Sequence, residues 1–446
     1  MAAEVVAGPG AEGRALSAGE SLVGLEVEVE VGAVAHGGHC VARHEGRVVF
    51  VRHALPGELV LARVTEGSDG DRFVRADAVA VLRAAPGRVE VRCPVAGPGG
   101  CGGCDWQHAS LPTQRDLKAA VVSEQLQRLA GLDVDVVVEA VPGDDDGLAW
   151  RTRVQLAVDA DGAPGLRRHR SHDVIPVSHC PIAHPGVDAT GVTAVPWPGV
   201  RSVEVVVPSA AQEPALVVVE PTGRRPRLPS VRASVTLLDA EGTLERVSGR
   251  SWVREDVIAG DWRRGFRVSG SGFWQVHPGA AGALVGAVLD GLAPRPGEQV
   301  LDLYAGVGLF AAALAHRVGP DGAVLAVEGD PRAVRDARRN LHDLPGVGIT
   351  QGRVDRVLGA MLADGLTADL VVLDPPRTGA GRRVVEQVCS LGARAVGYVA
   401  CDPAALARDV AYAAQHGYRL ASLRALDLFP MTHHVECVAV LVPTGE

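Results

Sequence analysis

The chain has 446 residues, 47% apolar and 22% charged, which is enough for several domains with apolar cores. It contains no apolar run long enough to span a bilayer and we recognise no N-terminal secretory signal, so we expect a cytoplasmic protein without a membrane partner. We also expect a monomer. A net charge of −9 excludes a uniformly basic nucleic-acid-binding protein. All positive side chains except Lys118 are arginines, which reflects either a local phosphate-binding face or GC-rich coding.

The N-terminal region is predicted to be a short disordered tail, residues 1–19, followed by a small β-barrel over residues 20–84. Runs such as LEVEVEVGAVAHG alternate apolar and polar residues with a period of two and are separated by turns that contain glycine or proline. The pattern alone fits any small β-domain. The stretch HCVARHEGRVVFVRHALPGELV resembles TRAM domains, and this resemblance implies an OB-like barrel that binds RNA.

The central region, residues 85–255, is predicted to be an α+β domain. A helix is expected in LPTQRDLKAAVVSEQLQRLAG, and strands are expected in RTRVQLAVDA and SVEVVVP. Local positive charge occurs at Arg151 and Arg153 and again in GLRRHRSH, which contains Arg167, Arg168 and Arg170. The second group is either a contact for an RNA strand or a solvated turn.

Four of the eight cysteines form a candidate metal site at the start of this region. Cys93, Cys101 and Cys104 lie in CPVAGPGGCGGC, and Cys180 in SHCPIAHP supplies a fourth thiol. A C-x-x-C pair on a glycine-rich loop, with two further thiolates, suits zinc or an iron–sulfur cluster, and the spacing leaves both open. Without a secretory signal, a disulfide framework is not expected.

The C-terminal region, residues 256–446, has the pattern of a parallel, doubly wound α/β sheet. Short apolar runs that end in an acid or a glycine alternate with helical segments such as GLFAAALAHRVG. The predicted fold class is therefore α/β, with a Rossmann-like C-terminal domain. Ligands of such sheets bind beyond the carboxyl ends of the strands.

The first strand and turn of this region form a candidate nucleotide site. In VLDLYAGVGLF, Asp302 lies near the end of the predicted strand, and Gly306 and Gly308 let the backbone approach a ligand at a helix N-terminus. Glu328 ends the next strand, where an acid can bind a ribose diol. A phosphate loop of the G-x-x-x-x-G-K-[ST] type is missing, and this order resembles class I S-adenosylmethionine-dependent methyltransferases more than dehydrogenases.

Three separated motifs in this region resemble the RNA uracil-C5 methyltransferase family, which makes 5-methyluridine. They are LDPPRTGAG, with Asp374; ACDPAA, with Cys401; and LDLFPMTHHVE, with Glu436. The resemblance implies that Cys401 is the nucleophile, that Glu436 is the base, and that Asp374 contacts both uracil and cofactor.

The same resemblance implies further binding residues. GFWQVHP is similar to the family's F-x-Q-V-N, which makes Gln275 a cofactor contact and Phe273 a stacking surface for the substrate. It also implies that the S-adenosylmethionine site includes Tyr304, Gly306 and Glu328.

The residue types fit the chemistry of methylation at C5. Addition of a thiolate to C6 of uracil makes C5 nucleophilic enough to attack the methyl sulfonium, and a base then removes the C5 proton so that the cysteine leaves. Residues that differ from the family pattern beside the nucleophile are Ala400, Asp402 and Ala405. A carboxylate at residue 402 is expected to raise the pKa of the neighbouring thiol.

The resemblance also extends to the cysteines, since CGGCDWQH is similar to the family's [4Fe–4S] loop, and it favours ribosomal over transfer RNA as the substrate. Two other functions stay open. One is a non-catalytic iron–sulfur RNA-binding protein, favoured by the altered residues beside Cys401. The other is a uridine methyltransferase that acts on transfer RNA. A DNA cytosine-C5 methyltransferase fits less well, because those enzymes place the cysteine where this chain has Asp374-Pro375-Pro376.

Overall fold

The computed structural model describes residues 19–143 and 146–445. The predicted disordered tail, apart from residue 19, lies outside the described residues. The chain forms two compact units, Met1–Arg88 and Val89–Glu446. No helix in the described part of the chain is both long and apolar enough to cross a bilayer.

The first unit contains a closed five-stranded barrel with the order β1-β2-β3-β5-β4. Its strands are β1 (Glu26–Val34), β2 (Cys40–His44), β3 (Arg47–Arg52), β4 (Leu59–Glu66) and β5 (Phe73–Arg83). Burial alternates along β1, as the period-two pattern predicts, because successive side chains point to opposite faces of a strand. The predicted barrel is therefore confirmed.

The second unit begins with helix α1 (Leu111–Gln125), which continues as a π-helical turn to Ala130, and then contains a seven-stranded sheet. The sheet order is β13-β12-β11-β10-β7-β8-β9. The strands are β7 (Arg153–Val158), β8 (Pro164–Arg167), β9 (Val174–Pro176), β10 (Val200–Val206), β11 (Leu216–Pro221), β12 (Ser234–Leu238) and β13 (Leu244–Ser248). The short helix α2 (Pro185–Ala189) lies between β9 and β10 in the chain.

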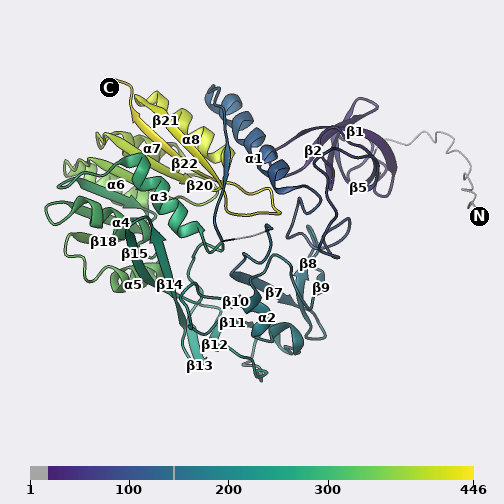
Figure 1. The fold of residues 1–446 in the computed structure, drawn as a ribbon, viewed down its shortest axis with the longest axis horizontal. Helices are drawn as coiled ribbons and strands as arrows, with labels where there is room; N and C mark the ends of the chain where they lie inside the picture. The colour runs from purple at the N-terminus through teal and green to yellow at the C-terminus, as the bar shows by residue number, and fades with distance from the viewer. Residues whose placement is uncertain (1–18, 144–145, 446) are drawn as a thin grey trace, which may run out of the picture. The chain divides into compact units, whose positions relative to one another are not determined.

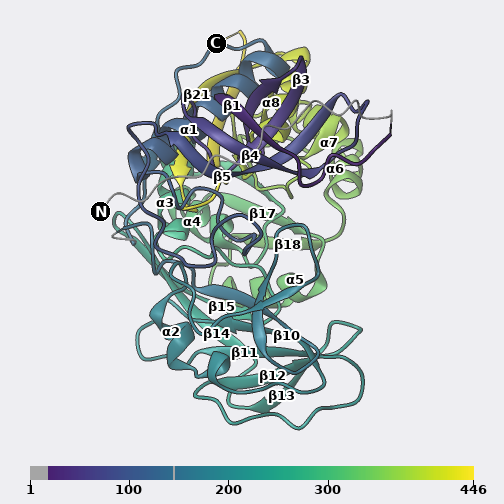
Figure 2. The same ribbon diagram turned by 90° about the vertical axis from the view of Figure 1, so that its right-hand side faces the viewer.

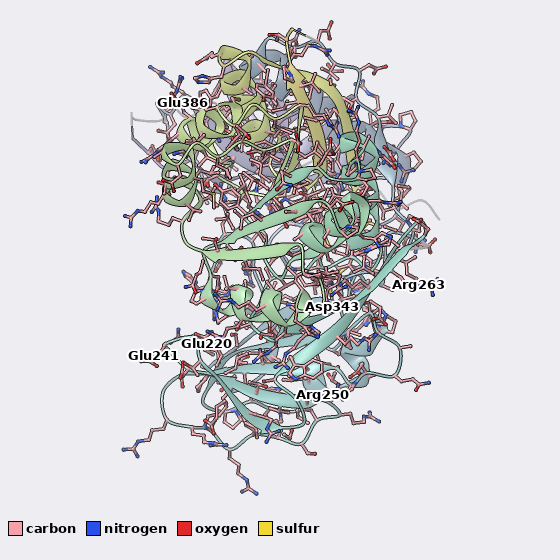
Figure 3. All side chains as sticks on the ribbon, turned by 90° about the vertical axis from the view of Figure 1, so that its left-hand side faces the viewer. Glu220, Glu241, Arg250, Arg263, Asp343 and Glu386 are labelled. Carbon is pink, nitrogen blue, oxygen red and sulfur yellow. The ribbon has the colours of Figure 1, made fainter. Side chains whose placement is uncertain are left out.

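A β-hairpin, β14 (Trp252–Ala259) and β15 (Trp262–Ser269), joins this sheet to the C-terminal part of the unit. One face shares a core with Val206 and Leu216 of the seven-stranded sheet, and Figure 2 shows the hairpin beside β10 and β11. Arg264 of β15 forms an ion pair with Asp343, which is labelled in Figure 3 and follows α5.

The C-terminal part is an eight-stranded sheet with the order β18-β17-β16-β19-β20-β22-β21-β6 (Figure 1). Its strands are β6 (Val138–Ala140), β16 (Gln299–Leu303), β17 (Ala323–Glu328), β18 (Val347–Gln351), β19 (Leu370–Leu373), β20 (Ala395–Ala400), β21 (Tyr418–Asp427) and β22 (Glu436–Pro443). Strands β16 to β20 run parallel, and β22 is antiparallel to both β20 and β21.

Helices cover both faces of this sheet, as the doubly wound prediction requires. They are α3 (Ala280–Leu292), α4 (Leu309–Val318), α5 (Pro331–Asn340), α6 (Val354–Ala363), α7 (Gly381–Cys389) and α8 (Pro403–Gln415). Side chains of β19 alternate between the two cores, with Val372 packed among the residues of α3 and α4 and Leu373 among those of α7 and α8. The parallel direction of β16 to β20 places the loops after these strands at one edge of the sheet.

Candidate active site

The predicted nucleophile and base lie opposite each other at the edge of the C-terminal sheet. Ala400, the last residue of β20, pairs with Cys437 of β22. Continuing this antiparallel register by one residue sets Cys401 against Glu436, the first residue of β22. Asp374 directly follows β19, the parallel neighbour of β20. The three residues are far apart in the sequence and converge because their strands are adjacent.

Cys401, Glu436 and Asp374, which together we call the corner, shift one another's pKa values. Burial, then the charges of Glu436 and Asp374, raise the pKa of the Cys401 thiol to about 11, while Arg377 lowers it. Burial and Asp374 raise the pKa of Glu436 well above its ordinary value, and Arg377 again opposes them. Burial raises the pKa of Asp374 to about 7. A corner that favours protons on its acids keeps a carboxylate from repelling a forming thiolate.

Asp402 has a structural role that the sequence did not reveal. It is the N-cap of α8, and its Oδ1 accepts a hydrogen bond from the Ala405 N–H at 2.8 Å. Asparagine and aspartate cap helices about equally well, so this replacement preserves the helix start that follows the nucleophile. The charges that raise the pKa of Cys401 most are Glu436 and Asp374.

The loop between β21 and β22 contributes two histidines to the corner that sequence reasoning missed. His434 Nε2 lies 3.5 Å from Arg377 Nη2, and the His433 and His434 rings are 4.1 Å apart. Burial, then the neighbouring His433 and Arg377, lower the pKa of His434 to about 3, so its ring is neutral. The signal was present in the sequence, because Arg377 and both histidines belong to the motifs that contain Asp374 and Glu436.

The predicted cofactor site forms where β16 and β17 end. Glu328 accepts hydrogen bonds from the Gly306 N–H at 2.8 Å and from the Asp330 N–H at 2.6 Å. Each carboxylate oxygen keeps a further lone pair for a ribose hydroxyl. Gly306 has φ +55°, and a Cβ there would meet no atom within 4 Å, so the space beside this turn is open.

Asp302 lies beneath this turn and holds it to α4. Its Oδ2 accepts from the Ala311 N–H at 2.8 Å, and burial, followed by Asp374 and Glu328, raises its pKa to about 8. Tyr304 follows β16 with φ +62°, a left-handed conformation that costs a non-glycine residue about 1–3 kcal/mol and that accumulates at functional sites. Strain at this position supports its expected role beside the ligand.

The predicted residues of the segment after β15 differ sharply in exposure. Gln275 is buried, whereas Phe273 is 74% exposed. A phenyl ring that is mostly in water is poorly explained by packing and is available for stacking on a base. His277, in place of the family's asparagine, accepts the Gly279 N–H at the start of α3.

The four predicted cysteine ligands line one cavity of about 50 Å³. Its lining includes Cys93, Cys101, Cys104 and Cys180. The sulfurs already receive hydrogen bonds, from the Gly103 N–H to Cys101 Sγ at 3.3 Å and from Gln107 Nε2 to Cys104 Sγ at 3.5 Å. Burial raises the pKa of Cys104 to about 12, and the other three thiols contribute to this rise.

The donor set suits a metal centre in its chemistry, because four thiols share one buried cavity. The positions of the side chains, however, do not match a metal centre. In the described part of the chain, no three His, Cys, Asp or Glu residues are grouped as they would be around an ion. The predicted iron–sulfur loop is therefore not established by the fold.

An arginine-lined groove of about 430 Å³ lies next to the cysteine cavity and shares Cys101 and Arg151 with it. Its basic residues are Arg151, Arg167, Arg168, Arg170 and Arg201. One acid, Glu220, labelled in Figure 3, also lines the groove and pairs with Arg201 at 3.1 Å. The predicted RNA-strand segment therefore lies in a concave, basic part of an acidic protein.

Comparison with known proteins assigns both ends of the chain. Residues 20–79 match the TRAM domain model, and residues 244–443 match the model described as tRNA (Uracil-5-)-methyltransferase. An uncharacterized RNA methyltransferase of Streptomyces avermitilis is 55% identical over 95% of this chain and 100% of its own. One from Bifidobacterium longum is 38% identical over 93% of this chain and 96% of its own.

Among solved structures, the tRNA (uracil-54, C5)-methyltransferase of Pyrococcus abyssi, in complex with S-adenosyl-L-homocysteine, has the same fold. The TM-score is 0.70 at 23% identity, over 93% of this chain and 100% of that one. The family matches, the full-length relatives and the class I fold agree with one another. The chain therefore belongs to the uracil-5 RNA methyltransferase family and is an S-adenosylmethionine-dependent RNA methyltransferase with a TRAM domain.

Proposed function

We propose that the protein transfers a methyl group from S-adenosylmethionine to C5 of a uridine in RNA through a covalent bond between Cys401 and C6. The observation that carries the proposal is the register between β20 and β22, which sets Cys401 against Glu436 beside Asp374. In this scheme Cys401 adds to C6, Asp374 contacts the base, and Glu436 removes the C5 proton.

The resting protonation of the corner suits such a sequence. Cys401 is a thiol in the free protein, since its pKa is about 11, and the positive charge of Arg377 favours its ionisation. A proton on Glu436 would remove the repulsion between its carboxylate and the thiolate. Glu436 must lose that proton again before it can act as the base that takes hydrogen from C5.

The cofactor and substrate contacts follow the same geometry. We assign Gln275, Tyr304, Gly306, Glu328 and Asp374 to the S-adenosylmethionine site, and Phe273 and Asp374 to the flipped uracil. A target base must leave its stack to reach a thiol at a strand end, and an exposed aromatic ring such as Phe273 can stack against it. The boundaries 20–84, 85–255 and 256–446 are our working domains, with RNA held by the first two and chemistry in the third, in a cytoplasmic monomer.

Methyl-labelled S-adenosylmethionine and unmodified total RNA test the reaction. The native chain should place label in 5-methyluridine, while Cys401→Ala should place none and keep the native circular dichroism spectrum. Cys389→Ala, which removes a partly buried thiol at the end of α7, is the matched control and should be active. Label in another nucleoside, or activity in Cys401→Ala, would contradict the mechanism. Binding of RNA without any transfer would favour the non-catalytic alternative.

We propose ribosomal RNA as the substrate class, because the barrel and the cysteine-rich loop occur together in this chain. Transfer RNA, named in the description of the matching family model, is the competing result. Separation of the labelled RNA by size decides between them: label in large RNA supports the proposal, and label confined to transfer RNA overturns it.

The arginine-lined groove is our candidate contact for the RNA backbone. Replacing Arg167 and Arg170 together by alanine should weaken RNA binding for all sequences. The slope of log affinity against log salt should fall by roughly 0.7–0.9 for each phosphate that the variant no longer neutralises. An unchanged slope would exclude the groove. Arg225→Ala, outside the groove in an exposed ion pair with Glu245, is the matched control.

We further infer that the four-cysteine cavity holds a [4Fe–4S] cluster with a structural role. The support is the shared cavity and the N–H groups directed at two of its sulfurs, since such second-shell hydrogen bonds accompany thiolate metal ligands. Iron and acid-labile sulfide analysis of anaerobically purified chain should give about four of each per chain. Zinc without sulfide, or no metal at all, would overturn this part of the proposal.

A further inference from the structure

The loop between β21 and β22, residues 428–435, ends directly before the predicted base Glu436 and contains strained backbone. Met431 has φ +68°, a left-handed conformation that a residue with a side chain rarely adopts. Such strain persists only where the surroundings hold it in place, at a cost of about 1–3 kcal/mol. The position of Glu436 therefore depends on what holds Met431.

Both backbone polar groups of Met431 are held by the segment that follows the cysteine loop. The N–H groups of Asp105 and Trp106 donate to the Met431 carbonyl at 2.9 and 3.0 Å. The Met431 N–H donates to Gln114 Oε1 at 2.7 Å. Gln114 is fully buried, so water does not compete for these bonds.

A second set of contacts reaches from Asp105 towards the catalytic corner. Asp105 Oδ2 accepts from the His433 N–H at 3.2 Å and lies 2.6 Å from His433 Nδ1. The His433 ring packs on His434, which lies 3.5 Å from Arg377. Asp105 therefore contacts the strained loop through its own backbone and its own carboxylate.

We propose that Asp105 is a positioning residue that keeps Glu436 aligned with the C5 proton. This inference rests on the proposed function, because it needs Glu436 as the base. In the step concerned, Glu436 takes the proton from C5, the C5–H electron pair forms the C5=C6 double bond, and the C6–S bond breaks to return a thiolate to Cys401. Addition of Cys401 to C6 comes earlier and does not use Glu436 as a base.

The experiment separates these two halves of the reaction. Asp105→Ala, Asp105→Asn and the control Asp116→Ala, which removes an exposed acid on α1, are compared with the native chain. Single-turnover reactions on the RNA fraction that the native chain methylates are quenched in detergent. Free methylated RNA and covalent protein–RNA adduct are then measured. RNA that carries 5-fluorouridine has no C5 proton to lose, so it reports the addition half alone.

For Asp105→Ala we expect the release of methylated RNA to slow roughly 10- to 100-fold, as misplacement of a catalytic group does, while adduct accumulates. Its rate of adduct formation with 5-fluorouridine RNA should stay within a factor of about two to three of native. Asparagine can still accept the backbone N–H bond, so Asp105→Asn should recover much of the rate. Asp116→Ala should behave as native, and all chains should contain equal iron.

Other results would overturn the proposal. Equal slowing of adduct formation and of release in both Asp105 variants would show a general loosening instead of positioning. A release rate for Asp105→Ala like that of Asp116→Ala would show that Asp105 does not position Glu436. If the native chain forms no adduct with 5-fluorouridine RNA, the covalent mechanism itself fails, and this result is distinct from failure of the Asp105 inference.

Discussion

The candidate active site and the cysteine cavity both contain buried or partly buried thiols, yet the fold holds them in different ways. The register between the neighbouring strands β20 and β22 determines how Cys401 and Glu436 lie relative to each other, and backbone hydrogen bonds fix that register. The cavity takes Cys93, Cys101 and Cys104 from one loop segment and Cys180 from another, outside the named strands and helices. A site at strand ends is preorganised by the sheet, whereas a site between loops depends on what binds there.

The two sites also differ in the groups that lower the pKa of their thiols. At the corner, Arg377 opposes the rise in the pKa of Cys401. In the cavity, burial and three thiols raise the pKa of Cys104 to about 12, and the opposing contribution comes from the neutral Gln107 side chain. Thiols with so high a pKa stay protonated unless a metal ion replaces the proton. Cys401 and Cys104 are therefore both protonated in the free chain, and only Cys401 has a positive side chain, Arg377, among the groups that favour its ionisation.

The sharpest test of the corner is Glu436→Gln, for which we expect the largest effect. Loss of the base should lower the rate of methylated RNA release by roughly 10²–10⁴-fold, because a neutral amide cannot take the C5 proton. Adduct should accumulate, in contrast to Cys401→Ala, which forms none. Free methylated RNA at the native rate would show that another group is the base.

The buried ion pair between Lys118 of α1 and Asp427 at the end of β21 joins α1 to the strand that precedes the loop before Glu436. Breaking this pair tests how much it stabilises the fold. Lys118 Nζ lies 2.5 Å from Asp427 Oδ1 and donates to the Phe429 carbonyl at 3.0 Å. Lys118→Met leaves a buried carboxylate without its partner and should lower the free energy of unfolding by about 3–5 kcal/mol. Urea unfolding measures the change.

The double variant Lys118→Met, Asp427→Asn should recover part of that loss, because it no longer buries a lone charge. Arg225→Met, which breaks an exposed pair with Glu245, should change the free energy by less than about 1 kcal/mol. A similar small change for Lys118→Met would show that the buried pair does not stabilise this fold.

The cavity is tested by Cys104→Ser against Cys389→Ser. If four thiolates hold a cluster, the first variant should lose iron and melt several degrees lower, since metal binding contributes to folding. The second removes a thiol of α7 that lies outside the cavity and should keep native iron and melting temperature within about a degree. Equal melting temperatures for both would show that the loops hold the cavity without a ligand.

A further test concerns the pH dependence of stability, through Asp302. Its pKa is about 8 in the folded chain against an ordinary value of 3.8, so the folded state keeps a proton that the unfolded state releases. Stability from this group is therefore complete below about pH 4 and is lost as the pH rises to about 8. Asp302→Asn should flatten the fall in melting temperature between about pH 5 and 8 without changing its value near about pH 4. An unchanged slope would contradict the raised pKa.

Local patterns in the amino-acid sequence were sufficient to predict the barrel and the doubly wound sheet, whereas most of the individual site residues were predicted from the resemblance of their motifs to a known family. Alternation along residues 26–34 follows from the period of a strand, and Glu328, Asp374 and Cys401 lie at strand ends where ligands of such sheets bind. The same kind of pattern predicted α1 and the glycine turn. The strand-end pattern by itself indicated Glu328, while the candidate nucleophile and base were found through the resemblance of their motifs to the family.

Only the tertiary structure shows which segments that are distant in the sequence pack against one another. β6, from residues 138–140, pairs with β21 and extends the C-terminal sheet, and α1 packs on α8 of the same part. Contacts such as Lys118 with Asp427, or Asp105 with His433, join residues that lie at opposite ends of the second unit's sequence. No local periodicity encodes them, because they arise from the packing of whole elements. Such contacts hold the strained loop next to Glu436, which motifs along one chain do not reveal.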